Sequence, residues 1–209
     1  MGFEATGWYL AIIDNPFVNP DKWKIKYIKG PSTHGVIIGS SAVLKEGNYI
    51  YAYGVKEPGT HEVFLVRFEN QRLLKGELSG LEWWTRTGWV KDPGGIPKSS
   101  VLFSGQTEFS VTWDQKLEKY IQVQTYGFGK AGIGYRTSPN LWGPWSDPVI
   151  FHTPLLSDPQ EFVYTARAHP ELVSGGILIT YNINNFDFGK LVSNENIYFP
   201  KFIKLIIQP

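Results

Sequence analysis

The amino-acid sequence predicts an all-β protein, on the basis of its composition, its short apolar segments and the recurrence of those segments. Of the 209 residues, 15% are aromatic, and the chain holds 22 Gly, 14 Pro and a single Met. Aromatic and β-branched residues that Gly and Pro interrupt at short intervals favour strands joined by tight turns over helices. A hydrophobic fraction of 42% is enough for a sizeable core, which excludes a disordered chain.

The first half of the chain is expected to hold two strands and then one antiparallel meander. The expected strands are Gly7–Asp14 and Lys22–Ile28, followed by Val36–Leu44, Tyr49–Val55, Glu62–Phe68 and Leu81–Trp89. In the second strand, Trp23, Ile25 and Tyr27 alternate with lysines, which is typical of a strand with one apolar and one wet face. The last four strands follow one another across short connections, which predicts one sheet of consecutive strands.

The strand pattern then recurs twice. The second copy spans Glu108–Trp113, Tyr120–Tyr126, Ala131–Thr137 and Val149–His152, and the third spans Val163–Val173, Ile177–Ile183 and Tyr198–Ile207. In each copy the second strand ends in Tyr followed by Gly or Asn, within YIYAYG, YIQVQTYG and ILITYN. This recurrence predicts a β-propeller of four-stranded antiparallel blades. A β-sandwich, which also consists of several short strands, is the alternative.

The strand count predicts a single domain of about three and a half blades, since each blade of a propeller has four strands. The expected divisions are 1–30 for a partial blade, 31–98 and 99–154 for two blades, and 155–209 for the C-terminal blade. An open arc leaves unpaired strand edges, so either the chain is part of a larger propeller or irregular segments or another chain cover these edges. We therefore expect a homo-oligomer formed through the open edges, with a two-fold dimer as its simplest form.

Charge and residue usage exclude several classes of function. The 20 Lys and Arg nearly balance the 19 Asp and Glu, so neither nucleic acid nor an anionic membrane is an expected partner. No segment approaches the roughly 20 apolar residues of a membrane helix, and the first ten residues lack the pattern of a signal peptide. The chain has no Cys and its four His lack short ligand spacing, so we expect neither a metal site nor a cofactor. A calcium or sodium ion held by oxygens in a central channel is left open.

Strand direction predicts where ligand-binding residues gather. Consecutive antiparallel strands reverse direction, so the start of the innermost strand of each blade lies on the same face of the disk as the end of the second strand. The residues expected to bind the ligand at these positions are His34, Tyr126, Arg167, Asn182 and Asn184.

Glu108 is the expected general acid. It directly precedes the alternating segment Phe109–Val111, so its side chain can point into the central channel. Burial there would raise the pKa of the carboxyl toward that of a general acid. The alternative is that Glu108 caps a turn or pairs with a neighbouring Arg or Lys.

Arg167, His169 and Glu171 form a polar row, since residues two apart in a strand point to the same face. Pro170 between them suits an innermost strand along a channel better than a central strand. Glycoside hydrolysis needs two carboxylates, about 5–5.5 Å apart for retention or about 6.5–9.5 Å for inversion. Glu108, Glu171 and His169 are therefore the candidate catalytic residues. A structural network that ties blades together is the alternative for the row.

Tryptophans supply either sugar-stacking surfaces or blade packing. The candidates are Trp83, Trp84, Trp89, Trp142 and Trp145. Their large apolar rings in blade turns favour packing of one blade against the next, so packing is the expected role.

Several segments resemble a known family. These are GPWSDP (143–148), FVYTARAHPEL (162–172), GGILITYNINN (175–185) and YFPKF (198–202), which are similar to the C-terminal part of a bacterial family of five-bladed propellers. That family is similar to the furanosidase-type glycoside hydrolases, which include glycoside hydrolase family 43. A weaker resemblance extends to residues 39–54 and 107–126. The resemblance implies a five-bladed propeller, a carbohydrate ligand at the axial channel and a secreted or periplasmic location.

In the furanosidase-type enzymes a general-base Asp, a pKa-modulating Asp and a general-acid Glu meet on the central axis. This chain corresponds to the family from its second blade onward, and none of its Asp residues matches the general base. The resemblance therefore implies a carbohydrate-binding, glycoside hydrolase-like propeller that acts on a poly- or oligosaccharide. A non-catalytic sugar-binding or protein-interaction module is the alternative.

Overall fold

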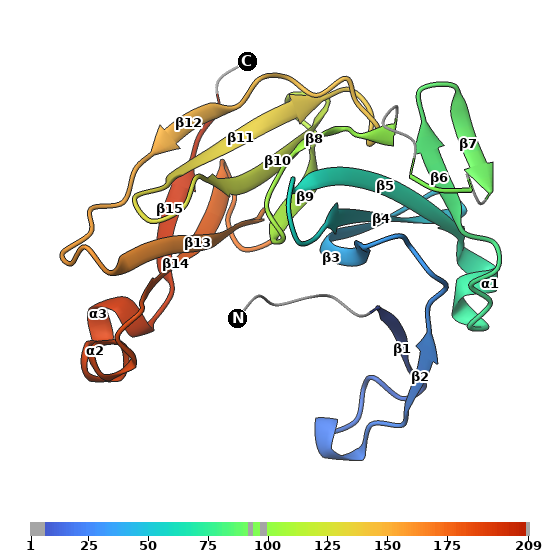
Figure 1. Ribbon diagram of the computed structural model, residues 1–209, viewed down its shortest axis with the longest axis horizontal. Helices are drawn as coiled ribbons and strands as arrows, with labels where there is room; N and C mark the ends of the chain where they lie inside the picture. The colour runs from blue at the N-terminus through green and yellow to red at the C-terminus, as the bar shows by residue number, and fades with distance from the viewer. Residues whose placement is uncertain (1–6, 92–93, 97–99, 208–209) are drawn as a thin grey trace. The chain divides into compact units, whose positions relative to one another are not determined.

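The computed structural model describes residues 7–91, 94–96 and 100–207 and shows an all-β chain of antiparallel sheets (Figure 1). The chain divides into two compact units, Met1–Ser104 and Gly105–Pro209, called unit 1 and unit 2 below. Helices are few and short, and none in the described part of the chain is long and apolar enough to cross a membrane.

Unit 1 is built around a sheet whose main strands follow in chain order. They are β3 (Val36–Glu46), β4 (Tyr49–Lys56), β5 (Glu62–Glu69), β6 (Glu82–Thr85) and β7 (Gly88–Lys91), and a short strand, β8 (Phe103–Ser104), also pairs with β5. Gly47 forms the tight turn from β3 to β4 with a φ of 55°, a left-handed conformation that costs glycine little. Helix α1 (Asn70–Leu74) lies in the connection from β5 to β6.

The segment Leu81–Trp89, expected to be one strand, is a hairpin. Strands β6 and β7 pair with each other through the register Trp84 with Trp89, and the two indole rings lie 5.2 Å apart. The chain turns at Arg86 and Thr87, where the hydroxyl of Thr85 donates to the Gly88 carbonyl. An alternating apolar pattern does not by itself show where a strand reverses.

Strands β1 (Tyr9–Ile13) and β2 (Ile25–Lys29) form a hairpin, with the 3-10 turn η1 (Pro20–Lys22) in the connection between them. The face of this hairpin that packs on the core is the opposite of the expected one. Its register pairs Leu10 with Ile28, and both side chains pack against the core of unit 1. Ile25 and Tyr27 therefore point outward, and they are 40% and 66% exposed. The expectation that these side chains form the buried face is wrong, because Ile28 fixes the inner face.

The core of unit 1 consists of apolar side chains from β3, β4, β5 and β6 and from the connection before β6. Its buried members are Val36, Ile38, Ala52, Phe64, Val66, Phe68, Leu78 and Trp83. Trp83 is 3% exposed, and its ring lies edge-on to that of Phe64. Trp83 is thus a packing residue of this core.

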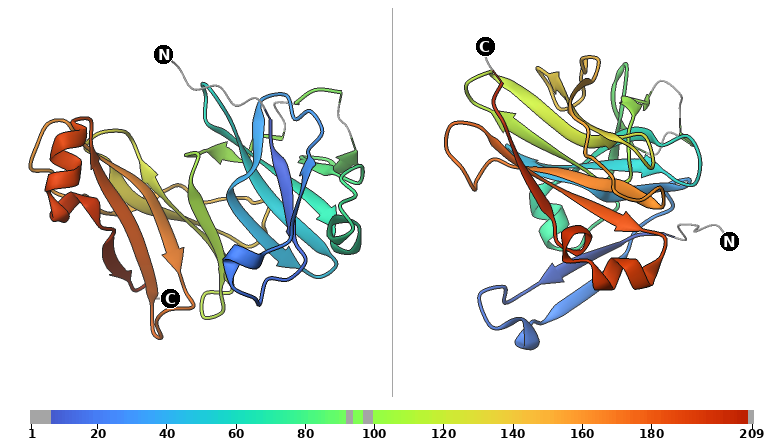
Figure 2. Two further views of the ribbon diagram at one scale, coloured as in Figure 1. Left: turned by 90° about the horizontal axis from the view of Figure 1, so that it is seen from below. Right: turned by 90° about the vertical axis from the view of Figure 1, so that its left-hand side faces the viewer.

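Unit 2 holds two further meanders. One sheet contains β9 (Phe109–Asp114), β10 (Lys119–Tyr126), β11 (Gly132–Ser138) and β12 (Val149–His152), and the other contains β13 (Glu161–His169), β14 (Ile177–Asn185) and β15 (Lys201–Leu205). Two short helices, α2 (Phe188–Ser193) and α3 (Glu195–Tyr198), connect β14 to β15 (Figure 2). The side chains of Asp187 and Asn194 cap the N-termini of these helices. Helix α3 includes Tyr198, and the strand expected over Tyr198–Ile207 is limited to Lys201–Leu205.

The two sheets of unit 2 pack around one apolar core. Ile121, Val123 and Ile133 of the first sheet are fully buried in it, together with Val163 and Ile179 of the second. Along β13 and β14 these side chains alternate with less buried ones. Strand β10 is buried on both faces, because Gln122 and Gln124 on its other face are also buried.

The free edge of β13 is covered within unit 2. The backbone N–H of Val163 donates to the Gly129 carbonyl at 3.2 Å. The N–H of Ala166 donates to Thr125 Oγ1 at 3.2 Å, and that of Ala168 donates to Ser110 Oγ at 2.8 Å. Hydroxyl side chains of β9 and β10 thus take the place of a neighbouring strand and fix β13 beside them.

Candidate functional site

A pocket of about 240 Å³ lies in unit 2, where β9 and β13 begin and β10 ends. It is lined by Gln106, Thr107, Glu108, Thr125, Gly127, Phe128, Phe162, Val163, Tyr164 and Thr165. It combines a carboxylate, several hydroxyls and an aromatic wall, the mixture typical of a site for a polar ligand with an apolar face.

Glu108 lies in the turn just before β9 and lines this pocket. Its carboxylate accepts a hydrogen bond from Thr165 Oγ1 of β13. A register irregularity of β13 lies between Tyr164 and Arg167, and within it Thr165 has a φ of 58°. This conformation turns the Thr165 hydroxyl toward the carboxylate and fixes the orientation of Glu108.

Four aromatic side chains, which we call the aromatic wall, lie beside this carboxylate: Phe128, Phe162, Tyr164 and Phe186. The rings of Phe128 and Phe162 are stacked, with centroids 5.7 Å apart and planes inclined by 20°. Phe186 lies 4.8 Å from Phe162. Phe128 and Phe186 are nonetheless 75% and 67% exposed, so the wall presents apolar surface to solvent.

Asn182 and Asn184, two of the expected ligand-binding residues, lie next to the aromatic wall. In the β13–β14 register, Asn184 stands opposite Phe162 and Asn182 stands opposite Tyr164. Directly opposed residues of an antiparallel pair project from the same face of the sheet, so the two amides and the two rings share one face. Arg167, opposite Thr180, continues this face along β13.

Tyr126 ends β10 one residue before the pocket-lining Gly127. Its hydroxyl donates to Gln122 Oε1 at 3.3 Å, and its ring lies 5.9 Å from the Arg136 guanidinium carbon. Burial raises the pKa of the Tyr126 hydroxyl, with the Arg136 charge opposing this shift. Tyr126 thus supports the end of β10 from within the sheet.

His169 and Glu171 lie at the other end of β13. The strand starts at Glu161 and ends at His169, so Arg167 does not lie at the start of an inner strand as expected. About 13 Å of extended chain separates Thr165, which contacts Glu108, from His169. The structure therefore does not bring Glu171 together with Glu108 as a pair of carboxylates.

His169 contacts two neighbouring side chains at this far end of β13. His169 Nε2 lies 2.8 Å from Thr180 Oγ1, and His169 Nδ1 lies 3.6 Å from Glu171 Oε1. The Glu171 side chain is 65% exposed, in the turn that follows β13. His34, also expected in the site, belongs to unit 1 and occupies an exposed turn before β3.

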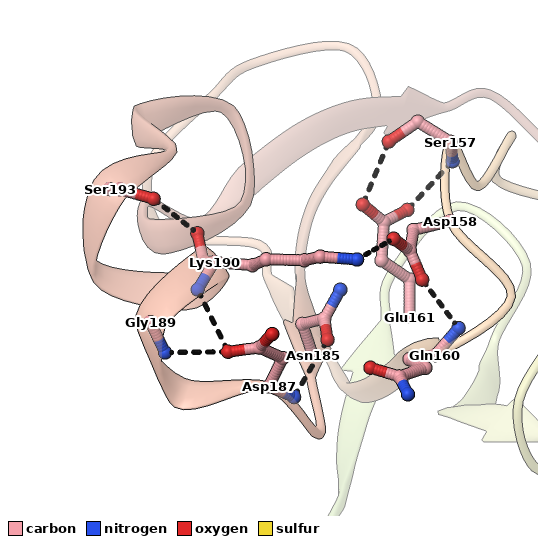
Figure 3. Close-up of polar contacts among 9 residues, drawn as sticks. All are labelled: Ser157, Asp158, Gln160, Glu161, Asn185, Asp187, Gly189, Lys190 and Ser193. Carbon is pink, nitrogen blue, oxygen red and sulfur yellow. Dashed lines mark hydrogen bonds and ion pairs between the residues drawn. The ribbon is translucent and has the colours of Figure 1, made fainter.

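A cluster of polar contacts joins α2 to the segment that leads into β13 (Figure 3). Glu161, which begins β13, accepts hydrogen bonds from the backbone N–H and the hydroxyl of Ser157 at 2.7 and 2.8 Å. Lys190 of α2 forms an ion pair with Asp158 at 2.5 Å. The Asp187 carboxylate accepts from the Gly189 N–H at 2.9 Å and so caps α2. These contacts fix the chain just before Phe162 and just after Phe186.

The ion pair shifts the pKa values of both Lys190 and Asp158. The hydrogen bond from Lys190 lowers the pKa of Asp158, and the same contact raises the pKa of Lys190. Both groups are therefore charged at neutral pH.

Across the described ranges, no group of three or more Asp, Glu or His residues is arranged to hold a metal ion.

Sequence reasoning did not identify the aromatic wall. It considered the tryptophans for sugar stacking, but none of the five candidates lines this pocket. The available signal was the alternation of Phe162, Val163 and Tyr164 at the start of β13, in which Val163 enters the core and the two rings face away from it.

Comparison with known proteins identifies a family. A family model described as "Domain of unknown function (DUF5005)" matches residues 1–206. No curated protein matches the chain. Among solved structures, the chain is similar to a "putative hydrolase from Bacteroides ovatus ATCC 8483", with a TM-score of 0.58 and 18% identity over 80% of this chain and 44% of that chain. The chain thus spans less than half of that protein, and the likeness concerns the fold. The match across residues 1–206 shows that the chain belongs to the DUF5005 family.

Proposed function

We propose that this protein binds carbohydrate, with a sugar ring on the aromatic wall and sugar hydroxyls at Glu108. The observation that carries this proposal is an exposed cluster of aromatic rings beside a carboxylate that a neighbouring hydroxyl orients. One face of a sugar ring consists of C–H groups and packs well on a flat aromatic side chain. Its rim consists of hydroxyls, which donate readily to an ionised carboxylate.

Exposure of the aromatic wall supports a binding role over a packing role. Exposed apolar side chains that stand singly are common, whereas a contiguous apolar patch marks an interaction site. Phe128, Phe162 and Phe186 lie in mutual contact and two of them are mostly exposed. A ligand that covers these rings would remove their apolar surface from water.

The neighbouring polar side chains favour an oligosaccharide over a single sugar. Asn184, Asn182 and Arg167 follow one another along the face that begins at the aromatic wall. Amide and guanidinium groups donate hydrogen bonds to sugar hydroxyls and ring oxygens. A chain of several sugars would contact the pocket and this face at the same time.

The proposed architecture is a partial five-bladed propeller of the furanosidase type. Three successive antiparallel meanders whose strands follow in chain order support it, as does the sequence resemblance described above. The mutual packing of the two sheets of unit 2 is also what adjacent blades require.

Hydrolysis of the bound carbohydrate is a second candidate, favoured by the oriented Glu108 and by the name of the similar Bacteroides ovatus protein. Glu108 is the one carboxylate among the described residues that line the pocket, whereas hydrolysis needs two. Carbohydrate binding is therefore the better supported function.

Affinity electrophoresis in gels that contain soluble arabinan, xylan or β-glucan tests the proposal. We expect at least one polysaccharide to retard the protein, and the variant Phe128→Ala/Phe186→Ala to lose this retardation, because it lacks most of the exposed aromatic wall. Phe17→Ala is the matched control, since Phe17 is fully exposed in unit 1. Equal retardation of the wall variant and the wild type, or no retardation in any gel, would contradict carbohydrate binding at this site.

A further inference from the structure

One face of the sheet formed by β13, β14 and β15 points away from the core of unit 2, and we call it the β13–β15 face. On β13, Ala166 and Ala168 are buried in that core, so Arg167 between them projects from the β13–β15 face. Phe162 and Tyr164 of the aromatic wall belong to the same face. A cationic side chain therefore lies beyond the aromatic wall on one continuous surface.

Strand β15 adds a second cation and an aromatic ring to this face. Ile203 and Leu205 contact the core of unit 2, so Phe202 and Lys204, which alternate with them, project from the β13–β15 face. The register places Phe202 in the same cross-strand row as Arg167, with one residue of β14 between them. Phe202 is 62% exposed, so its ring is accessible to a ligand.

The β13–β15 face is positively charged. Its strand residues in the described chain are Phe162, Tyr164, Arg167, His169, Leu178, Thr180, Asn182, Asn184, Phe202 and Lys204, and none of these is an Asp or a Glu. Glu171, in the turn beyond β13, lies 3.6 Å from His169. No ion pair joins Arg167 or Lys204 to a carboxylate within the described residues. Lys204 Nζ donates to the Ser174 carbonyl at 3.3 Å, a contact that leaves its charge uncompensated.

We infer that the carbohydrate ligand is an acidic polysaccharide, with sugar hydroxyls at Glu108 and a uronate carboxylate at Arg167. This inference rests on the carbohydrate binding proposed above and names the class of the ligand. A guanidinium donates two parallel hydrogen bonds to a carboxylate, a geometry that an ammonium group does not provide. Arg167 is therefore the side chain on this face that suits a uronate best.

The length of the β13–β15 face requires a polymer. Asn184 stands beside the aromatic wall and Thr180 stands beside Arg167, and the two are four positions apart on β14, which is about 14 Å of extended strand. This span is longer than one sugar ring. In a polymer that carries repeated carboxylates, a second carboxylate can reach Lys204 while a sugar between them stacks on Phe202.

The charges also set the orientation of the ligand. The Glu108 carboxylate at the pocket repels a uronate, whereas Arg167 and Lys204 attract one. Neutral parts of the polysaccharide therefore lie at the pocket, and charged parts lie toward β15.

Titration calorimetry with matched polysaccharides tests this inference. The probes are polygalacturonate and glucuronoxylan, each compared with its carboxyl-reduced form, in which the uronate carboxylate is converted to a primary alcohol. The titrations are made at physiological ionic strength, where attraction by net charge alone is screened. We expect at least one acidic polymer to bind at least about tenfold more tightly than its reduced form, because reduction removes charge-assisted hydrogen bonds.

Variants assign this preference to the β13–β15 face. Arg167→Gln/Lys204→Gln should lower the ratio of the two affinities to about one, because glutamine keeps hydrogen-bond donors but carries no charge. Loss of hydrogen bonds to sugar hydroxyls weakens binding of both forms alike and does not change this ratio. Arg86→Gln/Lys45→Gln makes the same charge change at two exposed positions of unit 1 and should retain the ratio. Matching melting temperatures of the two double variants would show that both are folded.

Equal affinity for the acidic and the reduced form of both polymers would overturn the inference, as would a preference that survives in Arg167→Gln/Lys204→Gln. Absence of binding by both acidic polymers would overturn it as well. The Phe128→Ala/Phe186→Ala variant keeps the two proposals distinguishable. If only the preference for charge is wrong, this variant loses binding of the acidic and reduced forms alike. If carbohydrate binding at the aromatic wall is wrong, it binds both forms as the wild type does.

Discussion

Thr165 adopts a backbone conformation that β-branched residues rarely adopt. A φ of 58° for such a residue costs on the order of 1–3 kcal/mol and persists only where surrounding contacts hold it. Here the neighbouring Ala166 N–H is bonded to Thr125 and the Thr165 hydroxyl is bonded to Glu108. The strain is therefore located at the residue that orients the carboxylate of the pocket.

Replacement of Thr165 by Val tests the contribution of the hydroxyl while it keeps the shape of the side chain. Val is also β-branched and keeps a similar backbone cost, but it removes the hydrogen bond to the Glu108 carboxylate. We expect the free energy of unfolding to fall by about 1.5–3 kcal/mol, the usual range for a hydrogen bond to a charged group. Urea denaturation measures this change, and Thr165→Ser should retain most of the stability. A fully stable Thr165→Val protein would contradict the proposed role of the hydroxyl.

Substitution of Glu108 by Gln tests the carboxylate itself. Gln keeps the size of the side chain and one acceptor oxygen but removes the negative charge. We expect polysaccharide affinity to fall by about tenfold, because hydrogen bonds to an ionised group are stronger than neutral ones. If the protein also hydrolyses its ligand, release of reducing ends should stop in the same variant. If both polysaccharide affinity and stability are unchanged in this variant, Glu108 does not bind the ligand.

At the scale of elements, the site depends on how β13, β14 and α2 are joined. Glu161 and Asp158 lie at the start of β13, and Asp187 and Lys190 lie just beyond β14. Their contacts place Phe162 and Phe186 next to each other although 24 positions separate them in the sequence. The aromatic wall is thus a product of tertiary packing.

The ion pair between Asp158 and Lys190 should make stability fall in acid. The pKa of Asp158 is lowered in the folded chain, so the pair stabilises the fold above the ordinary value of 3.8 and this contribution is lost as the pH falls through the folded pKa. The raised pKa of Lys190 places the corresponding loss for that group above 10.5. We expect Asp158→Asn to be less stable than the wild type at neutral pH and to lose less stability on acidification.

Urea unfolding at a series of pH values from neutral to about pH 2 measures this effect. Asp147→Asn is the control, because Asp147 is exposed and forms no ion pair among the described residues. Parallel pH profiles for Asp158→Asn and the wild type would show that the pair contributes no stability.

The sequence predicts most strands because apolar alternation and turn residues are local signals. Tyr49–Val55, Tyr120–Tyr126 and Ile177–Ile183 all lie within observed strands. The fold of Leu81–Trp89 into a hairpin and the outward face of Tyr27 were not predictable in this way, because both depend on pairing partners elsewhere. Glu108 could be found from its place before a strand, whereas Phe128 and Phe186 become neighbours of Phe162 only through the fold.

At the scale of the whole molecule, we propose that the outer face of the β1–β2 hairpin is a surface for self-association, in addition to the open strand edges expected from the sequence. Tyr9, Ile25 and Tyr27 share this face and are 63%, 40% and 66% exposed. A second copy of the chain that covers these side chains would remove apolar surface from water, and a two-fold dimer is the simplest closed arrangement.

Sedimentation or light scattering across a concentration series tests self-association. We expect the average mass to rise from monomer toward dimer as concentration increases. Tyr27→Lys should shift this transition to higher concentration, because it places a charge on the face, whereas the exposed control Lys24→Gln should not. A strictly monomeric, folded protein at high concentration would contradict this prediction.

The central claim is that a sugar ring stacks on the aromatic wall while its hydroxyls reach Glu108. A crystal structure with a fragment of the polysaccharide that retards the protein tests this most directly. We predict a sugar ring parallel to Phe128 or Phe162 and a hydroxyl within hydrogen-bond distance of the Glu108 carboxylate. An oligosaccharide bound elsewhere on the chain, with the aromatic wall uncovered, would contradict the claim.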